Sequence, residues 1–224
     1  MNEPLTHPHR SVFQREMERI RSATLILGDM VDSAIVHAVE ALVNRDVLAC
    51  TRIIAGDARV NELQREVREL CFNIILTQGP VASDLREVIG YLHMSAELER
   101  MADHCVSIAK IARNLADFPE VKPYVDVPKM AEFCAEQVRD ILGAMVGRDV
   151  ERARAVAQRD DRIDRIYHRI FDDLIELMIQ DSDTVYRATN LIFIAHHLER
   201  IADRVTNLAE DLVFLDTGEI VELG

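Results

Sequence analysis

The sequence repeats itself once, and this internal duplication constrains its fold more than any other feature. The segment 44–47 (N-R-D-V) returns 103 positions later as 147–150 (G-R-D-V). Further along, 98–103 (L-E-R-M-A-D) returns as 198–203 (L-E-R-I-A-D) after only 100 positions. Matches whose offset slips by three residues indicate a duplicated unit with one shortened turn, so the chain should fold as two similar halves.

Each half has the apolar spacing of three long helices. Hydrophobic residues recur every three or four positions, which is the period of one helix face, and a content of only 8 Gly favours helices. The expected helices span about 11–44, 46–77 and 81–117, and in the second half they begin near Lys129, Asp149 and Asp183 and end before Gly218. We therefore predict an all-α protein of two tandem, sequence-related three-helix bundles, with six long antiparallel helices. The bundles occupy 1–117 and 129–224, and three prolines make 118–128 a linker.

The composition excludes several functional classes. A formal charge of -13 repels the phosphate backbone, so nucleic acid is not an expected partner, and neither is an anionic lipid surface. The longest apolar runs, such as 191–195, are far shorter than the ~20 residues that span a bilayer. Residues 1–4 lack the charged and apolar regions of a signal peptide, so we expect a cytoplasmic protein. Without a C-x-x-C motif, the four cysteines are expected to be reduced and mostly buried.

Acidic residues interrupt the apolar faces of four of the expected helices. They are Asp57 in the second helix, Glu99 and Asp103 in the third, Asp160 and Asp164 in the fifth, and Glu199 and Asp203 in the sixth. The acids of neighbouring helices lie at nearly equal numbers of residues from the turns near 79–80 and 181–182. At about 1.5 Å per residue, they should therefore lie at the same height along the hairpin, to within a couple of ångströms. The sequence therefore predicts two carboxylate clusters, one across each hairpin.

Such clusters need a positive partner. Carboxylates about 5 Å apart repel by roughly 3 kcal/mol per pair at an effective dielectric constant near 20. A divalent or trivalent metal ion (Mg, Mn, Fe or Zn) would supply the charge, and oxygen-only ligands favour hard cations over zinc. The alternative is a purely structural, salt-bridged layer formed by Arg100, Arg162, Arg200 and Arg204. Against it, an arginine next to an acid is rotated about 100° around the helix and tends to point away.

Catalytic motifs are missing from the sequence. A di-iron oxidase of this architecture uses Glu-x-x-His on two helices, and no Glu here has a His three positions later. H-E-x-x-H, G-x-S-x-G and a phosphate-binding glycine loop are also absent. The histidines near the acids (His93, His104, His196 and His197) are interpreted as half-exposed or capped residues. We therefore expect no enzyme, and keep a carboxylate-bridged, metal-dependent hydrolase or oxidase as an alternative.

Four runs of residues resemble the PhoU family, the accessory proteins of the phosphate-specific transport system. They are 78–86 (Q-G-P-V-A-S-D-L-R), 97–104 (E-L-E-R-M-A-D-H), 197–211 (H-L-E-R-I-A-D-R-V-T-N-L-A-E-D) and the tail 217–219. The resemblance spans both halves. It implies two three-helix bundles, usually as a homodimer, with metal bound on E(D)-x-x-x-D motifs. The implied ligands are Glu99, Asp103, Glu199 and Asp203, with Asp57, Asp160 and Asp164 as their hairpin partners.

The resemblance also implies a function in signalling. Members of the family convey the state of the phosphate importer, through its ATPase subunit, to a membrane sensor histidine kinase, and repress the phosphate-starvation response. They reach the membrane only through these partners. This sequence departs from the family at Asn61, where an acid is common. A neutral amide removes one charge, so the first cluster is expected to bind metal more weakly than the second.

Overall fold

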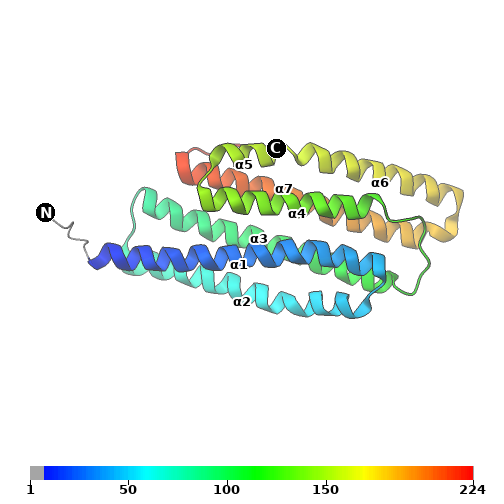
Figure 1. Cartoon of the computed structure of the whole chain (residues 1–224), viewed down its shortest axis with the longest axis horizontal. Coiled ribbons are helices and arrows are strands. Elements are labelled where there is room, and N and C mark those ends of the chain that lie inside the picture. Colours follow the sequence, from blue (N-terminus) through cyan, green and yellow to red (C-terminus); the bar gives the residue numbers. More distant parts are fainter. Residues whose placement is uncertain (1–7, 224) are drawn as a thin grey trace.

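The computed structural model describes residues 8–223 and confirms an all-α fold of two three-helix bundles (Figure 1). The helices are α1 (Pro8–Asn44), α2 (Val47–Gln78), α3 (Ser83–Leu115), α4 (Asp126–Gly147), α5 (Val150–Ala157), α6 (Asp160–Gln180), the short 3-10 helix η1 (Ser182–Thr184) and α7 (Val185–Thr217). No strand occurs between residues 8 and 223. The prediction about a signal peptide concerns residues 1–4, which lie outside this range.

The duplication extends to the caps between the helices. Asp46 caps α2 by accepting a hydrogen bond from the backbone N–H of Ala49 at 2.8 Å. Asp149 caps α5 in the same way, accepting from the backbone N–H of Arg152 at 3.0 Å. An aspartate at this position satisfies one of the free N–H groups of the first helical turn. The first helical turn of α2 and its counterpart in the second half are therefore built alike.

The second half differs from the prediction at its middle helix. One helix was expected from about Asp149 onward, but Gln158 and Arg159 separate α5 from α6. The backbone N–H of Arg159 bonds to the carbonyl of Val156 at 3.0 Å, three residues back instead of four. This tighter turn ends α5 and makes Asp160 the first residue of α6. A second difference is that α4 begins at Asp126, inside the predicted linker.

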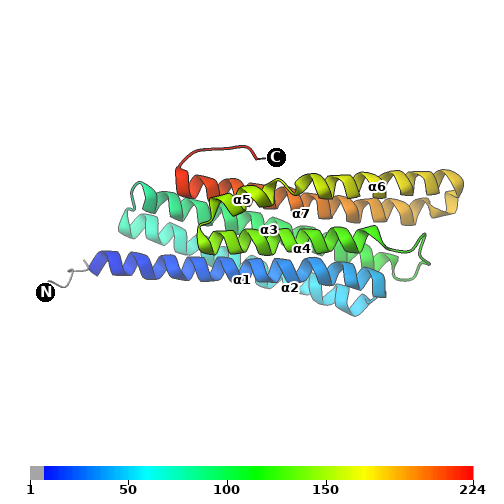
Figure 2. The ribbon, with the colours of Figure 1, turned by 45° about the horizontal axis from the view of Figure 1, so that its top comes forward.

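The two halves lie side by side along their length and share one hydrophobic core (Figure 2). Helices α1 and α3 of the first half contact α4 and α7 of the second. Gly28 lets α4 approach closely, because a Cβ atom there would lie 2.5 Å from a methyl group of Leu142. All four cysteines are buried and none is in a disulfide, as predicted. Within residues 8–223, no helix is both long and apolar enough to span a membrane.

Candidate functional site

The predicted acids of the second half come together across the hairpin of α6 and α7. We call Asp160, Asp164, Glu199 and Asp203 the second cluster. Burial, and then the negative charges of Asp164, Asp203 and Glu199, together raise the pKa of Asp160 to about 6. Burial and then the charge of Asp203 raise the pKa of both Asp164 and Glu199. Four carboxylates from two helices therefore share one partly desolvated region.

Only part of this charge is neutralised by the protein. Arg200 pairs with Asp203 at 2.6 Å, one helical turn away. Nδ1 of His196 lies 3.3 Å from Oε2 of Glu199. This contact is within ion-pair distance but is not a hydrogen bond, so Oε2 of Glu199 is buried without a hydrogen-bond partner, as is Oδ1 of Asp160. An unpartnered buried oxygen costs free energy, so the second cluster is under-compensated.

The arginines considered as alternative partners divide into two groups. Arg200 contacts an acid of the cluster, so the expectation that it would point away was wrong; its partner is three residues on, where helix side chains meet. Arg204 does point away and pairs with Glu97 at 3.3 Å. The Arg162 guanidinium lies 3.5 Å from the centre of the Phe133 ring. A fully salt-bridged layer is therefore not formed in the second half.

In the first half, Asp57 on α2 meets Glu99 and Asp103 on α3; we call these three residues the first cluster. Burial raises the pKa of Glu99, and the charges of Asp103 and Asp57 add to this effect. Burial and then Asp57 raise the pKa of Asp103 as well. Asn61, at the position of Asp164, donates a hydrogen bond to Oδ2 of Asp57 at 2.9 Å. The amide replaces one repulsion of the second cluster by a hydrogen bond.

The donor chemistry of both clusters fits a hard cation. Carboxylate oxygens are the ligands that Mg and related ions prefer. The buried oxygens Oδ1 of Asp57 and Oδ1 of Asp160 have no hydrogen-bond partner, and Oε2 of Glu199 has only the ion-pair contact with His196. However, no group of three or more His, Cys, Asp or Glu side chains is already arranged around one point in the described part of the chain. A metal ion would therefore need side-chain rotation, or water as a further ligand.

Two histidines join the halves beside the clusters. Nδ1 of His104 on α3 lies 3.1 Å from Nδ1 of His197 on α7. Burial, and then the charge of His197, lowers the pKa of His104 to about 4. In the duplicated sequence, Glu97 corresponds to His197 and Arg204 corresponds to His104, each 100 residues apart. Glu97 and Arg204 also contact each other, as an ion pair. The contact between His104 and His197 was not predicted from the sequence, although the duplication offset relates the two pairs.

Comparisons with known proteins extend over both halves. The PhoU domain model matches residues 24–112 and 127–212. A phosphate-specific transport system accessory protein PhoU homolog from Clostridium acetobutylicum is 33% identical over 215 residues, which cover 96% of this chain and 98% of that protein. The Aquifex aeolicus homolog is 34% identical over 208 residues, covering 93% and 94%.

Solved structures give the same result. The crystal structure of PhoU from Pseudomonas aeruginosa has a TM-score of 0.89 and 31% identity, covering 92% of this chain and 100% of that one. The phosphate transport system regulatory protein PhoU from Streptococcus pneumoniae has a TM-score of 0.87 and 30% identity, covering 94% and 100%. Sequence and fold therefore agree along nearly the whole length.

Proposed function

This chain belongs to the PhoU family, and on that premise we propose that it is an accessory protein of the phosphate-specific transport system that regulates without catalysing a reaction. The observation that carries the proposal is that the PhoU domain matches both halves of the chain. Relatives that match over nearly their full length are named as accessory proteins of this transport system. In this role it couples the ATPase subunit of the phosphate importer to a sensor histidine kinase. It acts as a cytoplasmic homodimer and represses the phosphate-starvation response.

A genetic experiment tests the regulatory role. Deleting the gene should raise the activity of a phosphatase reporter in phosphate-rich medium, and the wild-type gene should restore repression. Importer activity is measured in the same strains, which separates a defect in signalling from a defect in uptake. A reporter that stays repressed in the deletion strain, with normal phosphate uptake, contradicts the regulatory proposal.

We propose further that the carboxylate clusters bind hard divalent or trivalent cations, and that the second cluster binds them more tightly. Support comes from its four acids and from the buried, unpartnered oxygens of Asp160 and Glu199. The ion would be held by Glu199, Asp203, Asp160 and Asp164, and it would supply the positive charge that Arg200 and His196 provide only in part.

Elemental analysis of protein purified without chelator tests this site. Glu199→Gln combined with Asp203→Asn keeps the side-chain shapes but removes two charges, and should lower the metal content. The same exchange at Glu99 and Asp103 should have a smaller effect. Two exposed acids of α2, changed by Glu66→Gln and Glu69→Gln, provide a charge-matched control. Equal metal content in wild type and the first variant contradicts the proposed site.

A further inference from the structure

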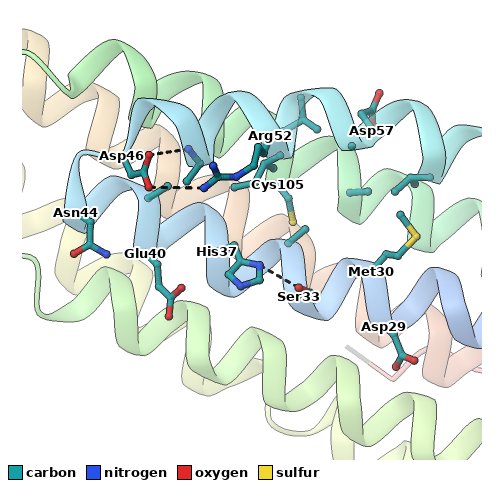
Figure 3. A pocket seen from close by; sticks show the side chains of 18 of the residues that line it. Asp29, Met30, Ser33, His37, Glu40, Asn44, Asp46, Arg52, Asp57 and Cys105 are labelled. Atoms are coloured by element: carbon teal, nitrogen blue, oxygen red, sulfur yellow. Dashed lines mark hydrogen bonds and ion pairs between the residues drawn. The ribbon is translucent and has the colours of Figure 1, made fainter.

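A groove of about 690 Å³ opens between α1 and α2 (Figure 3). Its floor is apolar and comes from all three helices of the first half: Ala34, Ala41, Ile53, Val60, Ala102 and Val106. Its rim carries the acids Asp29, Glu40 and Asp46, and Asp57 of the first cluster. The one lysine or arginine among the lining residues is Arg52, which is turned toward Asp46 with 3.9 Å between charged atoms. The groove is therefore apolar below and net negative above.

The corresponding place in the second half is filled by the chain's own arginines. Arg152 donates a hydrogen bond to Oδ1 of Asp140 at 2.8 Å. Arg159, at the break between α5 and α6, donates to the other oxygen of Asp140 and to Glu136 at 3.3 Å. Burial alone would raise the pKa of Asp140, but the two arginines lower it below its usual range. These contacts connect α4 to both α5 and α6.

The duplication offset shows why the groove of the first half stays open. The positions of Arg152 and Arg159 are occupied by Ala49 and Gly56, 103 residues earlier. A Cβ atom built on Gly56 would meet nothing within 4 Å. The two arginine side chains are therefore absent from the groove, and the space that they would occupy is free.

The anchors of the arginines have changed as well. Ser33 and His37 stand where the second half has Glu136 and Asp140, and they bond to each other at 3.1 Å. The negative charge has moved to the rim, where Glu40 replaces Gly143. A guanidinium lies against Gly143, because a Cβ atom there would be 2.9 Å from Nη1 of Arg152. The open groove thus keeps acids within reach of an incoming cation.

We propose that this groove docks a helical segment of a partner protein that presents apolar residues and arginines. Apolar residues of the segment would cover the floor of the groove. Its arginines would reach the acids of the rim and take the place of Arg152 and Arg159, which the first half lacks. Arginine fits because its stem packs on apolar surface while its planar head binds carboxylates with two hydrogen bonds. The volume suits several side chains of a helix in a groove rather than a single ion. The inference depends neither on metal binding nor on the signalling role.

Peptide binding to the purified full-length chain tests the docking site. The probe is a fluorescein-labelled, helical synthetic peptide with an alanine and leucine face and two arginines seven positions apart, the spacing of Arg152 and Arg159. The control peptide carries citrulline, which has the same shape but no charge, at both positions. Fluorescence anisotropy should show saturable binding of the arginine peptide, and binding of the citrulline peptide should be weaker by roughly tenfold or more.

A transplant variant then closes the groove. Ser33→Glu, His37→Asp, Ala49→Arg and Gly56→Arg transfer the arrangement of the second half to the first without changing the formal charge. Peptide affinity should fall by roughly tenfold or more. The helix content measured by circular dichroism should be the same as in the wild type, and the melting temperature should be no lower. The control places two arginines on the exposed surface of α2, by Ala55→Arg and Ala58→Arg.

A milder variant covers the case in which the transplant does not fold. Asp29→Asn with Glu40→Gln removes two exposed charges from the rim and should weaken peptide binding severalfold. Glu66→Gln with Glu69→Gln, outside the groove, should leave it unchanged. The proposal is overturned if the wild type does not bind the arginine peptide, if both peptides bind equally, or if neither groove variant weakens binding.

Discussion

The two halves of the molecule have the same fold but neutralise their polar surfaces differently. In the second half, Arg152 and Arg159 close the space between α4 and α5 through Asp140. In the first half, Ala49 and Gly56 leave the same space open. A duplicated fold can thus keep one copy internally paired while the other copy exposes an acidic, apolar-floored groove.

The carboxylate clusters show the opposite distribution. The first cluster has a built-in compensation, the hydrogen bond from Asn61 to Asp57. The second cluster has Asp164 at that place and keeps two buried oxygens without a hydrogen bond, whereas the first cluster keeps one, on Asp57. The second half is therefore the better paired at its groove, and the first half has the lower negative charge at its cluster. The predictions below test this comparison.

The largest effect is expected where the halves join. Gly28→Val should lower the free energy of unfolding by about 1–3 kcal/mol, because the new side chain would overlap Leu142 across the interface of α1 and α4. Gly56→Val is the matched control in the open groove, where a Cβ atom meets nothing within 4 Å, and it should change stability by about 0.5 kcal/mol or less. Urea unfolding of both variants measures the difference. Equal losses would mean that the groove is closed in solution.

Exchanging one residue between the clusters should exchange their metal affinities. Asn61→Asp adds the missing acid to the first cluster and should strengthen metal binding there by about tenfold, or about 1.4 kcal/mol. Asp164→Asn should weaken binding at the second cluster by a similar factor. Isothermal titration with Mn²⁺ after treatment with chelator measures both. Unchanged affinity in both variants would show that this position does not distinguish the clusters.

Much of the arrangement could be predicted because it depends on periodicity. The helices and the meeting of acids such as Asp160 and Asp203 follow from apolar spacing and from counting outward from a turn. The break before Asp160 could not be predicted, because the turn contains neither Pro nor Gly. It is visible only in the backbone hydrogen bond from Arg159 to Val156, which spans three residues instead of four. Nor could the groove, because it results from side chains that Ala49 and Gly56 do not have.

The arginine bridge of the second half should contribute a smaller amount of stability. Asp140→Asn removes the acceptor that Arg152 and Arg159 share and should cost about 1 kcal/mol, a modest value because both guanidinium groups are partly exposed to water. His37→Asn alters the corresponding position of the first half and should cost less, since the hydrogen bond of His37 is with the exposed Ser33. Thermal unfolding at low and high salt measures both, and the loss in Asp140→Asn should shrink at high salt.

A further difference concerns pH and the second cluster. In the folded state the pKa of Asp160 is about 6, above its usual 3.8. As the pH falls, the metal-free folded state therefore takes up a proton at a higher pH than the unfolded state does. Stability from this group is therefore lost as pH rises through 6 and regained as pH falls toward 4. Asp160→Asn should be more stable than the wild type at pH 7, and this advantage should disappear near pH 4. Urea unfolding in chelator at several pH values measures it, with Asp172→Asn, an exposed acid of α6 outside the cluster, as a control for lost charge. A constant difference across this range would show that the charge of Asp160 is already compensated within the protein.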